Sequence, residues 1–301
     1  EYAEPNYIAY AFMVPNDPYF APYQWHLDNP TGSGVEAQEA WEVSSGAGVT
    51  VAVVDTGVAY ENYGGFYQAP DLANTTFVAG YDFVSHDTHP NDDNNHGTHV
   101  AGTIAQSTNN NLGVAGIAYK ASVMPVKVLD KNGSGSYADV ADGIRWAADH
   151  GANVINLSLG GPTPSNALRD AVAYAYGKGV TVVAASGNDN GAVGYPAAYD
   201  DYVIAVGATR FDEQRAPYSN YGSSLDIVAP GGDMNVDQNG DGYGDGVLQQ
   251  TFSSGNARNF GYYFFQGTSM ATPHVAGVAA LVIAKGSATT PDTVRAALET
   301  T

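Results

Sequence analysis

The residues Val49-Thr-Val-Ala-Val-Val54 form a short, mostly β-branched run with one polar member. Comparable runs recur along the chain and alternate with longer helical patterns. Runs that are apolar at nearly every position are typical of strands in a sheet covered on both faces. We therefore predict an α/β fold, a three-layer sandwich with a mostly parallel central sheet flanked by helices. The predicted strands are 49–54, 122–129, 153–157, 180–185, 203–206 and 225–228, and the predicted helices are 96–106, 137–150, 166–176, 269–285 and 291–299.

The composition excludes several classes of protein. The chain has 301 residues, which fits one large domain or two small ones, and 44% of them are apolar, so it is not a disordered tail. Its 31 acidic and 11 basic residues give a net charge of -20, which repels phosphate backbones and anionic membranes. We therefore expect no nucleic-acid and no membrane partner. Since the chain has no cysteine, disulfides and thiolate metal sites are excluded.

Two stretches depart from the alternation of strands and helices. Residues 1–48 are rich in Tyr, Pro and Asn and are predicted to form an arm wrapped over the surface. Residues 231–266 are rich in Gly, Asp and aromatic residues, and are long enough to be an ordered insertion rather than a simple turn.

Three separate motifs carry reactive side chains. Asp55 follows the first predicted strand, His96 begins a predicted helix, and Ser269 lies in the first turn of an apolar helix. A nucleophilic serine needs an adjacent base, and the base needs an orienting acid. The unpaired N–H groups at a helix N-terminus can also stabilise a developing oxyanion. Each motif alone is weak, because a single Asp-Thr-Gly occurs by chance and Gly-x-Ser is commonly a helix cap. The three together are far more specific.

The order of these motifs along the chain, Asp, His, Ser, is the order found in subtilisin. Together with the block Gly267-Thr-Ser-Met-Ala-Thr-Pro-His-Val-Ala-Gly277, it resembles the subtilisin-like serine proteases, or subtilases, over roughly residues 14–299. The segment Pro15-Asn-Asp-Pro-Tyr-Phe20 looks like the thermitase-type branch of that family. The resemblance implies a subtilisin-like fold and peptide-bond hydrolysis through an acyl-enzyme.

The resemblance also implies the roles of the reactive residues. Ser269 would be the nucleophile, His96 the general base and later the acid, and Asp55 the group that fixes the imidazole tautomer. His99 is the competing base, but it matches the family's second, structural histidine. His274 is expected to point elsewhere on its helix and to serve packing.

Further resemblances concern substrate binding. Asn188 follows the predicted strand 180–185 and matches the family's oxyanion-binding amide; the alternative is a turn asparagine. An edge segment that pairs with an extended peptide binds the main chain of the peptide, whatever its side chains are. This mode of binding implies broad substrate specificity. Small residues would leave the first pocket roomy, which favours large apolar or aromatic side chains before the scissile bond. Asp189 could extend that tolerance to basic side chains or point into solvent. The substrate-binding candidates are Gly133, Ser134 and Gly135 on one edge, Ser158, Leu159 and Gly160 on the other, Ala185 and Gly194 in the first pocket, and Tyr137 at the rim of the second.

The excess of acidic residues calls for counter-ions, and Ca²⁺ prefers oxygen ligands. Two or three calcium sites are expected. Two of them rest on the resemblance: the family's strong calcium loop, and the second loop of the thermitase branch, where Ser85 and His89 depart from the usual residues. His86 and His89 suggest zinc, but the oxygen-rich surroundings favour solvated side chains instead. The candidate ligands are Asp17, Asp71, Ser107, Asn110, Leu112 and Val114 for the first site, and Asp82, Asp87 and Asn91 for the second.

A third candidate lies within the insertion. The run Asp237-Gln-Asn-Gly-Asp-Gly-Tyr-Gly-Asp245 follows the order of an EF-hand loop at the first, third, fifth, sixth and ninth places. Leu248 stands at the twelfth place instead of a bidentate glutamate, so another carboxylate such as Asp233 would have to close the shell. The alternative is a flexible acidic loop. The candidate ligands are Asp237, Asn239, Asp241, Tyr243 and Asp245.

The two ends of the chain depart from the family's pattern. Residues 1–13 resemble the final strand of the inhibitory propeptide, so they are predicted to be a propeptide-derived arm before a peptidase domain at 14–301. By the same resemblance, the family's usual C-terminal segment is expected to be absent after Thr301. The resulting expectation is a secreted, monomeric, calcium-stabilised serine endopeptidase made as a zymogen, with polypeptide substrates and its own propeptide as partners. Its rivals are an inactive binding module, a calcium-dependent surface protein and a serine esterase, whose usual order is Ser, Asp, His.

Overall fold

The computed structural model describes residues 13–28, 33–253 and 256–300. Its strands are β1 (Thr50–Asp55), β2 (Thr76–Phe77), β3 (Tyr81–Asp82), β4 (Ser122–Lys127), β5 (Val154–Leu157), β6 (Thr181–Ala185), β7 (Val203–Thr209), β8 (Ile227–Pro230), β9 (Val247–Phe252) and β10 (Phe260–Phe265). Its helices are α1 (Phe20–Tyr23), α2 (Ala37–Trp41), the 3₁₀ turn η1 (Pro70–Leu72), α3 (His96–Ala105), α4 (Tyr137–Asp149), α5 (Asn166–Gly177), α6 (Thr268–Lys285) and α7 (Pro291–Glu299).

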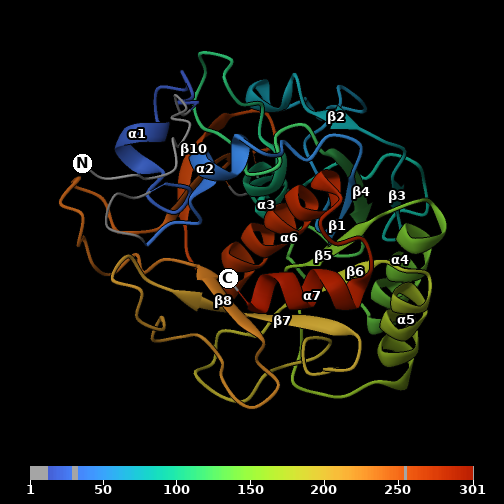
Figure 1. The fold of residues 1–301 in the computed structure, drawn as a ribbon. Helices are drawn as coiled ribbons and strands as arrows, with labels where there is room; N and C mark the ends of the chain where they lie inside the picture. The colour runs from blue at the N-terminus through green and yellow to red at the C-terminus, as the bar shows by residue number, and fades with distance from the viewer. Residues whose placement is uncertain (1–12, 29–32, 254–255, 301) are drawn as a thin grey trace.

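A parallel sheet runs through the centre of the molecule, with strand order β2-β4-β1-β5-β6-β7-β8 and β3 also paired with β4. Helices α3 and α6 cover one face, and α4 and α5 lie on the other side (Figure 1). Successive residues of β1 therefore enter different cores: Val51 and Val53 pack on the α3 and α6 side, whereas Ala52 and Val54 pack on the α4 and α5 side. This confirms the predicted three-layer α/β sandwich.

The N-terminal segment differs from the predicted surface arm. Leu27 is fully buried, and Trp41 is buried with its indole N–H donating to the carbonyl of Ile117 at 2.7 Å. Both residues belong to the core on the α3 and α6 side of the sheet. The burial of these two side chains could not be predicted from the polar composition of the stretch. A few large apolar side chains are enough to bury a segment, even where they follow no regular period. The predicted arm at 1–13 lies outside the described residues except for Met13.

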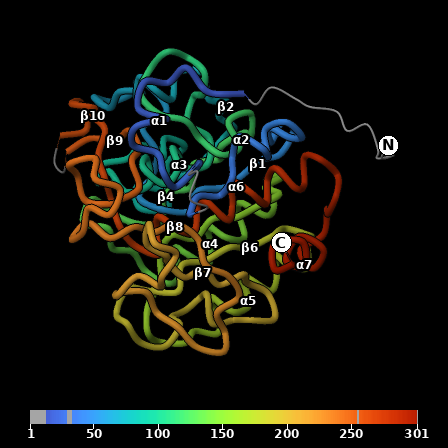
Figure 2. The backbone as a smooth tube through the Cα atoms, turned by 60° about the vertical axis from the view of Figure 1, so that its left-hand side comes forward, coloured from blue at the N-terminus to red at the C-terminus, as the bar shows by residue number. Residues whose placement is uncertain are grey.

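The stretch 231–266 contains a second, two-stranded sheet in which β9 and β10 pair antiparallel. Every residue of β9 is buried, whereas those of β10 are partly exposed. The hairpin lies beside α1 in both views (Figures 1 and 2), and the rings of Tyr23 and Phe264 meet edge to face with their centres 6.2 Å apart. β10 ends directly before the first turn of α6, so the insertion positions the start of that helix.

The carboxyl ends of three neighbouring strands meet at one edge of the central sheet. β1 ends at Asp55, β5 ends immediately before Ser158, and β6 ends shortly before Asn188. Ligand sites of open parallel sheets are formed at this edge. Among the described residues, no helix has the length and apolar character needed to cross a bilayer.

Candidate functional site

Asp55 and His96 are joined by a hydrogen bond at this edge. The Nδ1 atom of His96 lies 2.8 Å from Oδ1 of Asp55, which also accepts the backbone N–H of Thr56 at 2.7 Å. Asp55 is fully buried, whereas about a quarter of the His96 side chain is exposed. Because an ionised carboxylate can only accept, Nδ1 carries the proton of the neutral imidazole. Nε2 of His96 is then left with a free lone pair.

The first turn of α3 is fixed by groups that the sequence analysis did not single out. Asp92 is buried and accepts hydrogen bonds from the backbone N–H and the hydroxyl of Thr98, at 3.0 and 2.6 Å. It also accepts from the hydroxyl of Thr56 at 2.9 Å, which ties α3 to the end of β1. A carboxylate is favourable at a helix N-terminus because the helix dipole is positive there. The available signal in the sequence was an aspartate four residues before His96, ahead of a predicted helix.

A buried lysine supports the same region from β4. Lys127 donates to the carbonyls of Thr56 and Leu129 at 2.6 and 2.9 Å, and to the carboxylate of Asp93 at 2.7 Å. A close approach completes the joint: a Cβ atom on Gly97 would lie 2.1 Å from the carbonyl oxygen of Gly57, so only glycine lets α3 begin against the end of β1.

The pKa of His96 is raised above 6.5. Burial alone would lower it, but the nearby Asp55 carboxylate and its hydrogen bond outweigh burial, and the charge of Asp92 adds to them. The neighbouring carboxylates thus stabilise the protonated form of His96, while the neutral form is still present at ordinary pH. A general base requires both, because it must accept a proton during the reaction and lose it again.

Ser269 lies in the first turn of α6, after Gly267, and exchanges two hydrogen bonds with Ser158. Its hydroxyl donates to the carbonyl of Ser158 at 3.0 Å, and the Ser158 hydroxyl donates to the carbonyl of Ser269 at 2.8 Å. The Ser269 carbonyl is free for this bond because Pro273, four residues on, has no N–H. Ser269 and His96 line the same cleft of about 520 Å³. Among the described residues, no hydrogen bond joins their side chains.

Asn188 lies beside the residue that precedes Ser269. Its Oδ1 accepts the backbone N–H and the hydroxyl of Thr268, at 2.9 and 3.0 Å. Because a backbone N–H can only donate, this contact fixes which end of the amide is the oxygen. The NH₂ group has no acceptor within the described part of the chain, and Asn188 lines a second cavity together with Ser269. Two donors, the Asn188 amide and the Ser269 backbone N–H, are therefore available near the hydroxyl.

The predicted substrate residues fall on the walls of these two adjoining cavities. The cleft that holds His96 is lined by both predicted edges and by Tyr137, and the second cavity is lined by the predicted small residues. Asp189 is exposed and lines the second cavity, with its backbone N–H donating to Asn220 at 2.9 Å. The predicted residues on the first cleft are Gly133, Ser134, Gly135, Tyr137, Ser158, Leu159 and Gly160, and those on the second are Leu159, Gly160, Ala185 and Gly194.

His99 and His274, the other histidines of these motifs, are buried inside the protein. Nε2 of His99 lies 3.1 Å from the carbonyls of both Val247 and Tyr263, and its ring stacks on Phe265. Nε2 of His274 lies 2.8 Å from Nδ1 of His26. Burial lowers the pKa of His99 to about 3 and that of His274 to about 4, so both are neutral at ordinary pH. Neither faces the cleft.

The residues predicted for the first calcium site come together. Asp17 and Asp71 are buried; Asp17 accepts the N–H of Asn109 at 2.7 Å, and Asp71 accepts the side-chain amide of Asn110 at 2.8 Å. Burial raises the pKa of Asp71 to about 7, with a further contribution from the charge of Asp17. The Asn110 amide turns its nitrogen, not its oxygen, toward Asp71. Of the remaining predicted residues, Ser107 and Val114 are buried beside Asp71, and Leu112 is exposed on the same loop.

Tyr262 is an unpredicted member of this cluster. Its hydroxyl, carried by β10, lies 3.3 Å from Oδ2 of Asp71. The contact connects the cluster to the inserted hairpin, about 190 residues away in the sequence. No local pattern predicts a contact of such long range.

The residues predicted for the second calcium site are near one another along one loop. Asp82 and Asp87 pair through their backbones, and Asp82 Oδ1 accepts the N–H of Val84 at 2.7 Å. Asn91 is buried, and its Oδ1 atom has no partner among the described residues. Its amide nitrogen donates to Glu61 at 2.8 Å, which makes Glu61 a further acidic neighbour that the sequence analysis missed.

His89 was predicted to be solvated, and its side chain is partly exposed, but it also has protein contacts. Nδ1 of His89 lies 2.8 Å from Glu61, and its ring stacks on Tyr63 with the ring centres 3.5 Å apart. Glu61 and Tyr63 come from a separate loop, which explains why the local sequence gave no sign of the contact. His86 is exposed with a backbone φ of 57°.

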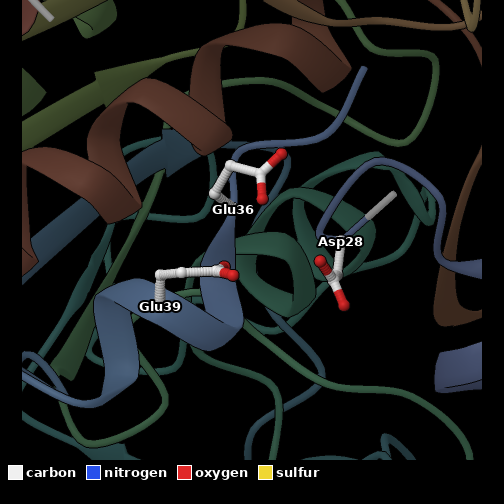
Figure 3. Close-up of side chains that lie close together, drawn as sticks. All are labelled: Asp28, Glu36 and Glu39. Carbon is white, nitrogen blue, oxygen red and sulfur yellow. The ribbon is translucent and has the colours of Figure 1, made fainter. Parts of the chain in front are cut away.

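One acidic group lies outside every prediction. Carboxylate oxygens of Asp28, Glu36 and Glu39 lie within 4.8 Å of one another at the start of α2 (Figure 3). Burial raises the pKa of Asp28, and the charge of Glu39 raises it further. The two glutamates are exposed. The group offers three ligand atoms for a cation, but exposed acidic side chains often lie together without one.

Comparisons with known proteins agree with this geometry. The family model described as "Subtilase family" matches residues 46–301. The chain is 44% identical to a thermophilic serine proteinase of Bacillus sp. (strain AK1) over 95% of its length, and spans 64% of that relative. It is 43% identical to thermitase of Thermoactinomyces vulgaris over 96% of its length, and spans 91% of that relative. A solved protease structure from Pseudoalteromonas arctica PAMC 21717 has a TM-score of 0.83 and 39% identity, covering 96% of this chain and 92% of that one.

Proposed function

The chain belongs to the subtilase family and is a subtilisin-like serine endopeptidase; from this premise we propose that Ser269, His96 and Asp55 are its nucleophile, general base and orienting acid. The observation that carries the proposal is the 2.8 Å bond between His96 and the buried Asp55, at the cleft that Ser269 also lines. This bond leaves Nε2 of His96 as the only imidazole atom able to take a proton from the cleft.

The proposed reaction proceeds by acyl transfer. The Ser269 hydroxyl turns from Ser158 toward His96, its oxygen attacks the substrate carbonyl carbon, and Nε2 of His96 takes its proton. Asp55 stabilises the imidazolium. The Ser269 N–H and the Asn188 amide stabilise the oxyanion. His96 then gives the proton to the amine nitrogen as the C–N bond breaks, and water activated by His96 releases the acid.

The proposed substrate is an extended polypeptide with a large apolar residue before the scissile bond. The edges at 133–135 and 158–160 flank the cleft, and edge segments of this kind pair with the main chain of a peptide. Gly160, Ala185 and Gly194 leave room in the second cavity, where a large side chain would lie. Cleavage-site profiling of a denatured protein should therefore give Phe, Tyr and Leu before the cut; equal cleavage after small residues would contradict this preference.

The decisive experiment replaces the nucleophile. Ser269→Ala should lower kcat on casein by about 10⁶-fold, the loss found when the triad serine of subtilisin is removed, and should abolish labelling by a serine-directed phosphonate. Its circular dichroism and thermal midpoint should stay those of the parent. Ser223→Ala, an exposed substitution, is the control. Undiminished hydrolysis by Ser269→Ala would remove this residue from the mechanism.

We also propose calcium at the first predicted site. The residues fit such an ion, because Asp17 and Asp71 are buried close together and the described contacts supply N–H and O–H donors but no basic side chain. When bound, calcium would neutralise the two carboxylates and hold the loop at 107–114. Asn91, with its unpartnered Oδ1, makes the same argument for the second site.

Chelation tests these two sites. Removing calcium should lower the thermal midpoint of Ser269→Ala, because a ligand at 100 times its Kd adds about 2.7 kcal/mol to folding stability. Asp71→Asn should respond less to chelator than Asp170→Asn, an exposed control on α5. Equal responses of all three proteins would contradict a calcium site at Asp71.

We propose, finally, that the enzyme acts outside the cell as a monomer after removal of an inhibitory propeptide. Millimolar extracellular calcium would fill weak oxygen-ligand sites, and the charge of -20 disfavours self-association. Active enzyme should appear in the culture medium, elute as a single chain in gel filtration, and be inhibited by its added propeptide. Activity confined to the cell fraction would contradict this location.

A further inference from the structure

We propose that the loop at residues 237–245 is a calcium site distinct from the two near Asp71 and Asp82. It lies in the inserted stretch, and its role is to hold the β9–β10 hairpin against the N-terminal segment. The inference does not depend on the proposed hydrolytic function. The ligands it assigns are the side chains of Asp237, Asn239, Asp241 and Asp245 and the carbonyl oxygen of Tyr243.

The backbone of this loop already curls around its first carboxylate. Asp237 accepts the N–H groups of Gly240 and Gly242, at 2.8 and 3.1 Å through its two oxygens. Gly242 stands at the sixth place of the EF-hand order, where a sharp turn requires glycine, and its φ is 91°. The Tyr243 carbonyl accepts no hydrogen bond within the described part of the chain. Sequence order and turn geometry therefore agree.

An independent observation comes from Asp245. This side chain is only 1% exposed; its Oδ2 accepts the N–H of Gln238 at 2.7 Å, which places the carboxylate at the loop, while Oδ1 has no partner among the described residues. A buried carboxylate oxygen without a donor is costly. Burial raises the pKa of Asp245, and the charges of Asp237 and Asp241 raise it further. A cation between these carboxylates would satisfy the oxygen and remove the repulsion.

The nearest arginine does not serve this purpose. Arg210 is paired with Asp212 and lies 3.9 Å from Asp233, outside the loop. Asp233 also accepts the N–H of Asn235 at 3.1 Å. Asp233 lies opposite Asp245, to which its backbone N–H donates at 2.9 Å. That Asp233 closes the shell stays a prediction. Leu248, at the twelfth place, is buried in β9.

The remaining places of the shell would be filled by water or by Asp233, and the number of charged ligands sets the expected affinity. Loops with fewer charged ligands than a sensor EF-hand bind more weakly, and extracellular modules have Kd values of about 10⁻⁴–10⁻³ M. We expect the calcium Kd of the loop to lie in that range. It would be filled in a calcium-rich medium and emptied by dialysis, unlike a tight structural site.

Tyr243 links the loop to the rest of the fold. Its ring stacks on Phe264 of β10 with centres 5.4 Å apart, and meets Tyr23 of α1 edge to face at 5.6 Å. An ion that fixes the Tyr243 carbonyl would therefore also fix the contact between the hairpin and α1. Because the carbonyl and the ring belong to the same residue, Tyr243 should sensitise the luminescence of terbium bound in the loop, which provides a local probe.

The test counts bound ions in the intact Ser269→Ala chain, which cannot digest itself. Asp237→Asn/Asp241→Asn should bind one calcium ion fewer per chain in equilibrium dialysis at 5 mM calcium, which is about five to fifty times the expected Kd. Asp170→Asn/Asp142→Asn, a charge-matched pair of exposed helix residues, should keep the full count. An unchanged count in the loop variant would overturn the proposal.

A second variant separates loss of ligands from collapse of the loop. Tyr243→Phe keeps the stacking ring and the carbonyl ligand, so its calcium count should equal that of the parent, while terbium emission excited through tyrosine should fall. A calcium count that fell in Tyr243→Phe as well would overturn the assignment, because occupancy would then follow the phenol group and not the five oxygens. Neither readout uses activity, so failure of the proposed hydrolytic mechanism would leave both interpretable.

Discussion

Ser158 and Ser269 hold one another through two hydrogen bonds, hydroxyl to carbonyl in each direction, at 3.0 and 2.8 Å. One of the two depends on Pro273, whose missing N–H leaves the Ser269 carbonyl without its helical partner. A proline inside a helix is ordinarily a defect. Here it frees an acceptor that a neighbouring strand end uses to position the first turn of α6.

Loss of the Ser158 hydroxyl should therefore affect catalysis more than binding. We expect Ser158→Ala to lower kcat by about tenfold, which corresponds to a loss of about 1.4 kcal/mol, within the range of one hydrogen bond. KM should change little, because the backbone of Ser158 that faces the cleft is unaltered. Steady-state kinetics on a peptide substrate measure both constants. A raised KM with unchanged kcat would mean that Ser158 acts in binding and not in positioning Ser269.

The Asn188 amide should contribute mainly to the transition state. Asn188→Leu keeps the size of the side chain but removes the donor, so kcat should fall by about 10²–10³-fold, the loss found for the equivalent donor in subtilisin. Asn166→Ala, an exposed substitution at the start of α5, is the control. If the Asn188 variant retained its kcat, the contact with Thr268 would be structural only.

The pH dependence of activity should report His96. A general base must be unprotonated, and the pKa of His96 is raised, so kcat/KM should fall as the pH drops through a value above 6.5. Asp55→Asn removes the charge that raises this pKa, so the fall should move to lower pH. It should also lower kcat by roughly 10⁴-fold, because an amide favours the wrong tautomer of the imidazole.

A charge-matched control makes this experiment specific. Asp189→Asn removes one negative charge from the wall of the second cavity, which His96 does not line. It should leave the position of the acidic limb nearly unchanged, since an exposed charge is screened by solvent. Equal displacement of the limb in both variants would mean that the overall charge of the cleft, and not the Asp55 bond, sets the pKa of His96.

The proximity of the site residues could be predicted from the pattern of strands and helices. Asp55, Ser158 and Asn188 each follow a predicted strand, and parallel strands end at a common edge, so their proximity follows from the α/β pattern. His96 and Ser269 lie at helix starts that their motifs mark. The six predicted strands agree with β1 and β4 to β8 to within a few residues for the same reason: each run is mostly apolar and short. The two-residue strands β2 and β3 were not predicted.

Contacts between distant segments could not be predicted from the sequence. The burial of Lys127, the pairing of Glu61 with His89 and the approach of Tyr262 to Asp71 depend on where loops come to lie, which no local period encodes. The β9–β10 hairpin was anticipated only as an ordered insertion, because its run at 247–252 mixes Gln and Thr with apolar residues.

Three buried histidines should make the fold sensitive to acid. The pKa values of His26, His99 and His274 are lowered, first by burial, whereas in the unfolded chain they return to about 6.5. Above that pH neither state binds protons, so this contribution to stability is complete. Below that pH these histidines bind protons in the unfolded chain but not in the folded chain. The free energy of unfolding should then fall by up to about 1.4 kcal/mol per pH unit for each histidine, until the folded values near 4 and 3 are reached.

Denaturant titration of Ser269→Ala between pH 7.5 and 5 measures this slope, with calcium held constant. His99→Asn, whose amide can still donate to the carbonyls of Val247 and Tyr263, should reduce the slope by the share of one histidine. Thr103→Val, a buried change on the same helix without a titratable group, should shift the stability equally at every pH. The comparison is made between variants because the raised pKa of Asp71 contributes a slope of opposite sign. Equal slopes in the parent and in His99→Asn would contradict the lowered pKa of His99.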